Sequence, residues 1–173
     1  MNKSEIYGEA YRLLNLITPL RADCGKACNK ACCSAVDEET GMYLFPYEEV
    51  MYVDCPPWLR VEETDFTYQR EKNALIALCE HPCTRELRPL SCRIFPLFPY
   101  LDKMGELKII MDPRGKGICP LVRHVTPNEL DPVFLKSVQL VFGVLLRFEP
   151  IHTFVFALSR QIDAVQSIYD KYI

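Results

Sequence analysis

Nine cysteines in 173 residues constrain this chain more than any other feature, because eight of them fall into two groups. The first group is Cys24, Cys28, Cys32 and Cys33. The second group is Cys79, Cys83, Cys92 and Cys119. Four thiolates satisfy one tetrahedral site, so the eight match two zinc sites, or one iron-sulfur cluster with a further ion. The residues alone do not divide the ligands between the sites, and ligands from both groups could meet at one ion.

The N-terminal segment lacks the apolar stretch and the small-residue cleavage site that are typical of a signal peptide. In a reducing compartment cysteines keep their thiols, which are soft metal ligands. We therefore expect a cytoplasmic protein whose cysteines bind metal. The alternative, buried thiols or disulfides, is disfavoured because core packing does not concentrate cysteines at this density.

Composition limits the partners of the chain. Apolar residues make up 49% of it and charged residues 25%, which suits a single folded domain spanning residues 1–173. A net charge of −3 without a basic run predicts no nucleic-acid partner. The most apolar stretch, 133–158, is interrupted by Lys136, Arg147 and Glu149, so we expect it to form core and predict no membrane partner.

The periodicity of apolar residues predicts helices at both ends of the chain. Apolar positions recur at three- and four-residue intervals over residues 4–20, with Ser4 as the N-cap. Helical patterns also cover 130–148 and 152–172, so residues 127–172 form a helical C-terminal part. Glu48 and Glu49 follow Pro46 and are expected to be acids at the start of a short helix.

The cysteine-rich core, residues 23–121, is predicted to be irregular. Prolines between residues 82 and 113 exclude a regular helix there, and only short strands are expected, at 42–45, 66–70, 74–78 and 106–111. Its loops carry little apolar mass, so a bound metal would replace a missing core. The predicted fold is α+β and helix-rich, with N- and C-terminal helices around an irregular, metal-stapled middle.

The second cysteine group lies in a recognisable segment, Arg88-Pro89-x-x-Cys92-Arg93-x-Phe95-Pro96. Together with the early Cys32-Cys33 pair and Cys119-Pro120, this pattern resembles the bacterial zinc- or iron-chelating domain family, which is defined by eight cysteines. The resemblance covers roughly residues 23–121 and implies metal chelation. The role of that family is largely unassigned, and a related cysteine-rich region occurs in flagellin lysine methylases. Cys55 and the helical tail after Val125 lie outside the family pattern.

We predict zinc as the bound metal, with all eight grouped cysteines as ligands. The alternative is an iron-sulfur protein in electron transfer, redox sensing or a methylation-type reaction. Arg88 and Arg93 are expected beside the thiolates, where they would offset negative charge, although both could be solvated loop charges. His81 could replace one thiolate, and Cys55 is expected to be a bystander.

Catalytic motifs are not visible in the sequence. It contains no glycine-rich phosphate loop, no nucleophile elbow and no His-Glu-x-x-His helix. The catalytic residues are therefore unknown from the sequence, and whether the protein is an enzyme stays open.

Overall fold

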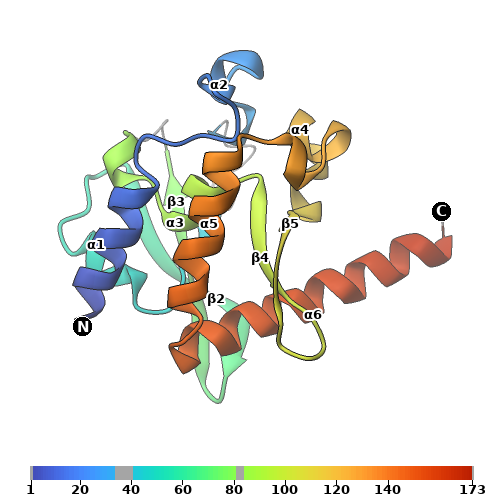
Figure 1. Ribbon diagram of the computed structural model, residues 1–173. Coiled ribbons are helices and arrows are strands. Elements are labelled where there is room, and N and C mark those ends of the chain that lie inside the picture. The colour runs from blue at the N-terminus through green and yellow to red at the C-terminus, as the bar shows by residue number, and fades with distance from the viewer. Residues whose placement is uncertain (1, 34–40, 81–83, 173) are drawn as a thin grey trace.

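The computed structural model describes residues 2–33, 41–80 and 84–172 as a mixture of helices and antiparallel strands (Figure 1), which confirms the α+β class. The α-helices are α1 (Lys3–Leu13), α2 (Cys24–Ala27), α3 (Leu90–Ile94), α4 (Pro120–His124), α5 (Pro132–Leu145) and α6 (Glu149–Tyr172). The short 3-10 helices are η1 (Ala31–Cys33), η2 (Glu48–Tyr52), η3 (Arg85–Leu87), η4 (Pro113–Gly117) and η5 (Pro127–Glu129).

The strands form two small antiparallel sheets. They are β1 (Gly41–Tyr43), β2 (Leu59–Gln69), β3 (Lys72–Cys79), β4 (Leu97–Leu101) and β5 (Leu107–Met111). One sheet has the order β1-β3-β2, and the other pairs β4 with β5. The β2–β3 hairpin confirms the predicted one and places Cys79 opposite Leu59 at its open end.

Helices form in each predicted terminal stretch, but α1 ends at Leu13 rather than near residue 20 and does not begin at the predicted Ser4 cap. Helix α1 begins at an Asn2 cap rather than at Ser4, and Asn2 and Glu5 exchange hydrogen bonds in a capping box. Helix α5 begins at an Asp131 cap, whose carboxylate accepts hydrogen bonds from the first-turn N–H groups. The Thr126 and Glu129 capping box belongs to η5 instead.

Helix α3 corrects the expectation that residues 82–113 contain no regular helix, and strand β4 corrects the expectation that the middle of the chain is irregular apart from the predicted strands. Pro99 lies inside β4, opposite Ile109. Because β4 pairs only with β5, Pro99 occupies an edge strand, where a missing N–H is tolerated. The two strands pack against α5, and α6 crosses both β2 and β4.

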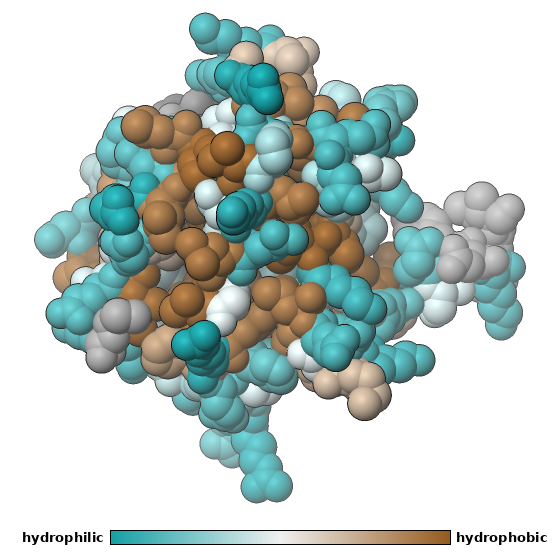
Figure 2. Space-filling view, in the orientation of Figure 1, coloured by the Kyte–Doolittle hydropathy of each residue, from teal (hydrophilic) through white to brown (hydrophobic). Residues whose placement is uncertain are grey.

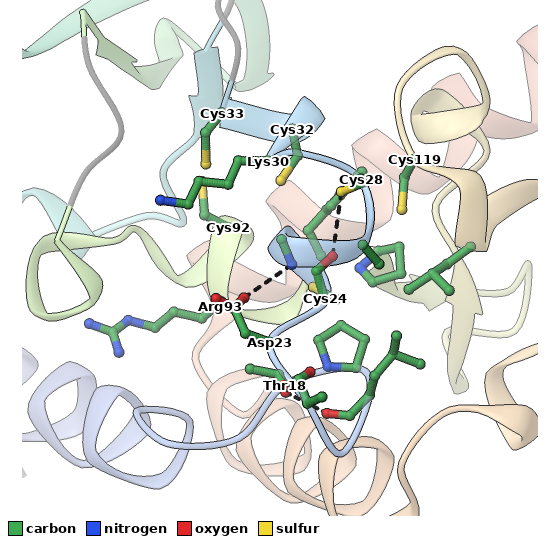
Figure 3. A pocket seen from close by; sticks show the side chains of 18 of the residues that line it. Thr18, Asp23, Cys24, Cys28, Lys30, Cys32, Cys33, Cys92, Arg93 and Cys119 are labelled. Atoms are coloured by element: carbon green, nitrogen blue, oxygen red, sulfur yellow. Dashed lines mark hydrogen bonds between the residues drawn. The ribbon is translucent and has the colours of Figure 1, made fainter.

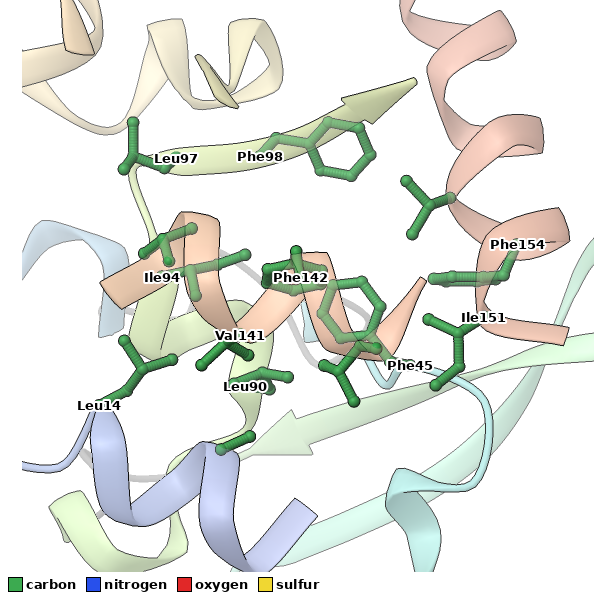
Figure 4. Packing of buried hydrophobic residues seen from close by; sticks show 14 of the residues in the cluster. Leu14, Phe45, Leu90, Ile94, Leu97, Phe98, Val141, Phe142, Ile151 and Phe154 are labelled. Atoms are coloured by element: carbon green, nitrogen blue, oxygen red, sulfur yellow. The ribbon is translucent and has the colours of Figure 1, made fainter. Parts of the chain in front are cut away.

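The main core fills the space between α1, α3, α5, α6 and β4 (Figure 4). Its centre is aromatic: the ring centroid of Phe45 lies 5.0 Å from that of Phe142 and 5.8 Å from that of Phe154. Such tilted and edge-on pairs add to the stabilisation from buried area.

The outer face of α5 is partly apolar, and Figure 2 shows apolar side chains gathered over it, where Val133 and Leu140 are exposed. Within the ranges that the structure describes, no helix combines the length and the hydropathy that a membrane span requires.

Candidate metal centre

Six of the eight predicted ligands line one pocket of about 540 Å³. Cys24 and Cys28 belong to α2 and its C-cap, Cys32 and Cys33 to η1, Cys92 to α3, and Cys119 to the N-cap of α4. Figure 3 shows these side chains around the same space, although they come from three distant segments of the chain. The fold therefore brings both cysteine groups to one place.

The first cysteine group reverses direction halfway along. Asp23 caps α2 by accepting a hydrogen bond from the Gly25 N–H at 3.0 Å. Asn29 and Lys30 then adopt left-handed backbone conformations, with φ of 51° and 55°. Such conformations are unfavourable for residues other than glycine, and they end the helix so that η1 folds back. Cys24, Cys28 and Cys32 therefore do not lie on one continuous helix.

The sulfur atoms fall into two neighbouring sets. Burial raises the pKa of Cys24, and the nearby Cys28, Asp23 and Cys119 raise it further. Arg88 acts on the same thiol in the opposite direction. Cys24, Cys28 and Cys119 are thus electrostatic neighbours, although Cys119 lies far from the other two in sequence.

Cys32 belongs to the second set. A hydrogen bond with Cys33 raises its pKa, followed by burial and by the charges of Cys33, Cys92 and Cys24. Each thiolate disfavours ionisation of the next because like charges repel at short range. A cation placed among them would reverse that effect, since it stabilises every thiolate around it.

Cys92 is held in place by a buried carboxylate. Glu48 is fully buried, and its Oε1 accepts a hydrogen bond from the Leu90 N–H at 2.6 Å, at the start of the helix that carries Cys92. The same oxygen accepts from the Tyr11 hydroxyl at 2.6 Å, and Oε2 accepts from the Phe45 N–H at 2.9 Å. One side chain thereby joins α1, η2 and α3.

Cys119 is positioned by a tight turn at η4. The Asp112 carboxylate accepts a hydrogen bond from the Arg114 N–H at 3.0 Å and so caps η4. The Cys119 N–H then donates to the Gly115 carbonyl at 2.8 Å. A Cβ atom on Gly115 would approach the Phe95 ring to 2.9 Å, so this close packing requires glycine.

Four arginines also line the pocket: Arg21, Arg85, Arg88 and Arg93. Arg93 is buried, and it donates to the carbonyls of Arg88 at 2.7 Å and Glu86 at 2.9 Å. Arg85 donates to the carbonyls of Asn15 and Ile17, just beyond the end of α1. Arg88 therefore acts on the Cys24 thiol, whereas Arg93 and Arg85 fix the backbone of the pocket wall, and the predicted role of Arg93 beside the thiolates stays a prediction.

Two predicted ligands are not among the pocket-lining residues. Cys79, like Cys55, packs against a smaller apolar cluster that includes Tyr52 and Leu59. Cys83 and His81 lie outside the described residues. Within the part of the chain that is described, no three His, Cys, Asp or Glu side chains form a group that could hold a metal ion in their present arrangement.

Sequence reasoning missed two residues that build the site. Glu48 was expected to be a first-turn acid of a helix, and it does lie there, but it points into the core. Arg85 belongs to no motif, and the only signal in the sequence was its position between Cys83 and Arg88. Their hydrogen bonds reach 42 and 70 residues along the chain, a separation that local patterns do not encode.

Comparison with known proteins finds no matching family model, no matching curated protein and no matching solved structure for this chain.

Proposed function

We propose that this protein binds zinc through the cysteines of the pocket, as a metal-binding module whose ion organises the loops around it. The observation that carries the proposal is the convergence of six cysteines from three distant segments on one pocket. Clustered thiols of this kind are soft ligands suited to zinc.

The ligands of each ion come from both cysteine groups in this proposal. Cys24 and Cys28 combine with Cys119, and Cys32 and Cys33 combine with Cys92, because these cysteines act most strongly on one another, although Cys24 also acts on Cys32. The sulfur atoms must draw closer to coordinate an ion. That movement costs little packing, since α2 and η1 contain no buried residue.

The surroundings of the pocket favour bound thiolates. Three thiolates on one divalent ion leave a net charge near −1, and Arg85, Arg88 and Arg93 line the same pocket. Hydrogen-bonded groups around a metal site commonly fix its ligands and tune the ion. The left-handed Asn29 and Lys30 fit this reading, because strained backbone is often found at ligand clamps.

Elemental analysis tests the proposal directly. Untagged protein purified without oxygen should contain at least one zinc ion per chain and no acid-labile sulfide. Cys92→Ser and Cys119→Ser should each lower the zinc content, because each removes one thiolate from a set. In cobalt-loaded protein, both changes should weaken the thiolate-to-cobalt charge-transfer absorption.

Cys55→Ser provides the matched control, because Cys55 lies outside the pocket and its thiol donates to the Tyr52 carbonyl. This variant should keep the zinc content of the parent protein. Protein from zinc- and iron-replete cells that contains neither metal would refute the proposal. Equal metal loss in the Cys55 and Cys92 variants would refute the assignment of the ligands.

An iron-sulfur cluster is the second candidate, because its ligands are also cysteine thiolates. Six thiols around one pocket include the four that a single cluster needs. Phe95 and Pro96 line the same pocket and would limit the access of water to a cluster. Iron with a matching amount of acid-labile sulfide, in brown protein purified without oxygen, would support an iron-sulfur protein instead of a zinc-binding one.

A further inference from the structure

Helix α6 extends beyond the body of the protein. Its first half packs on β2 and β4, whereas Figure 1 shows its C-terminal half projecting away from the rest of the chain. Val165 and Ile168 lie on this projecting half and are 51% and 59% exposed. A helical end without packing is marginal in water, so an apolar partner would stabilise it.

A groove lies at the root of the projecting half. It has a volume of about 1140 Å³ and separates α6 from η4 and α4. Its α6 side combines the apolar Leu158, Ile162 and Val165 with Gln161 and Gln166. The opposite wall is basic, with Arg114, Lys116 and Arg123.

We propose that the groove binds the projecting half of α6 from a second copy of this chain, forming a two-fold symmetric dimer. In an antiparallel arrangement with the axis at Val165, residue 168 of one copy lies opposite residue 162 of the other. The exposed Ile168 then covers the groove-lining Ile162, and each Val165 faces its counterpart. The two-fold rotation covers the exposed Val165 and Ile168 and fills the groove in both copies, as an isologous interface requires.

The charges of the groove support this occupant. The C-terminal turn of α6 carries the negative end of the helix dipole, with about half an elementary charge, while the sequence of that turn includes Asp170 and Lys171, which offset each other in formal charge. The antiparallel arrangement brings that turn of one copy beside Leu158 of the other, where the basic wall lies. The wall is preformed, because Arg123 donates to the Lys116 carbonyl at 2.6 Å.

Sedimentation equilibrium of the untagged full chain over a range of loading concentrations tests the dimer. The parent protein should show a concentration-dependent monomer–dimer equilibrium. Val165→Glu should weaken association by at least about tenfold, because two carboxylates would meet at the axis without water. Lys116→Glu should have a smaller effect that diminishes at high salt, since it acts through exposed charge.

Leu140→Glu is the matched control, because Leu140 is 59% exposed on α5 and outside the groove. It should associate like the parent protein, and circular dichroism should show that all three variants fold. A parent chain that stays monomeric at every concentration would overturn the proposal. So would a dimer that Val165→Glu leaves intact or that Leu140→Glu disrupts.

Discussion

Helix α5 and the walls of the cysteine pocket are stabilised in different ways. Five side chains of α5 are buried, namely Phe134, Val138, Val141, Phe142 and Leu145. In contrast, α2, η1 and α4 contain no buried residue at all. Apolar burial therefore holds the helical core, whereas the pocket walls depend on caps, turns and hydrogen bonds from arginine to backbone carbonyls.

Helix α3 joins the two regions. Leu90 and Ile94, one turn apart, are almost fully buried in the core, while Cys92 lies between them in sequence and lines the pocket. The position of Cys92 is thus fixed by core packing and by Glu48, whereas α2 and η1 have no comparable anchor. This contrast predicts that the core folds without metal and that the first cysteine group needs metal to become ordered.

Phe142→Ala should produce the largest effect on stability. Phe142 is fully buried against Phe45, and removing its ring leaves a cavity that should cost ~3–5 kcal/mol of unfolding free energy. Urea denaturation followed by circular dichroism measures this loss. If the core is independent of metal, the loss should be the same before and after treatment with a chelator.

Leu140→Ala, on the exposed face of the same helix, should change stability by no more than ~0.5 kcal/mol. A loss for Phe142→Ala that is small, or that appears only in metal-loaded protein, would show that metal also organises the core. The proposed separation between the two regions would then fail.

Glu48, which hydrogen-bonds to the start of α3 between the core and the pocket, makes the free energy of unfolding depend on pH. Burial raises its pKa from 4.5 to about 7, despite opposing hydrogen bonds from Tyr11, Leu90 and Phe45 and the opposing charge of Arg93. Between these two values the folded chain binds more protons than the unfolded chain. The free energy of unfolding should therefore fall by roughly 3 kcal/mol as pH rises from below 4.5 to above 7.

Glu48→Gln should remove this fall, because glutamine does not titrate. Urea denaturation at several pH values measures the slope, with the metal state held constant. Glu49→Gln is the matched control, since Glu49 is exposed beside it and should keep the parental slope. Tyr7 and Tyr52 also face Glu48, but both have pKa values raised above 10.0 and do not titrate in this range. An unchanged slope in Glu48→Gln would contradict the prediction.

Local patterns in the sequence predicted most of the secondary structure. The 3.6-residue periodicity predicted helices near α1, α5 and α6, and the strands predicted at 66–70 and 74–78 fall within the β2–β3 hairpin. Strand β4 was missed because a proline such as Pro99 disfavours a strand. Its edge position tolerates proline, but that position depends on tertiary structure.

The candidate site was predictable in composition but not in arrangement. The cysteine spacing identified the residues, yet the pairing of Cys24 with Cys119 depends on a fold that brings distant segments together. The reversal at Asn29 and Lys30 was also not evident, because these residues favour left-handed backbone only weakly. Metal binding and its ligand sets stay predictions until metal is measured.

Gly115→Ala should have the smallest of the three effects and should act on the pocket. The added Cβ would lie 2.9 Å from the Phe95 ring and 3.1 Å from Val122, so the turn before Cys119 must shift. Overpacking of this kind typically costs ~1–3 kcal/mol. Because the Cys119 N–H donates to the Gly115 carbonyl, the shift should also lower the affinity for zinc, measured by competition with a chromogenic chelator.

Gly117→Ala is the matched control, because it lies in the same turn and an added Cβ would meet no atom within 4 Å. It should leave stability and zinc affinity close to those of the parent protein. If Gly115→Ala lowers stability but leaves zinc affinity unchanged, the turn does not position Cys119 for metal. The contrast between the two regions requires that Gly115→Ala lower the free energy of zinc binding more than the free energy of unfolding. In that case this turn, rather than the core, positions the pocket wall.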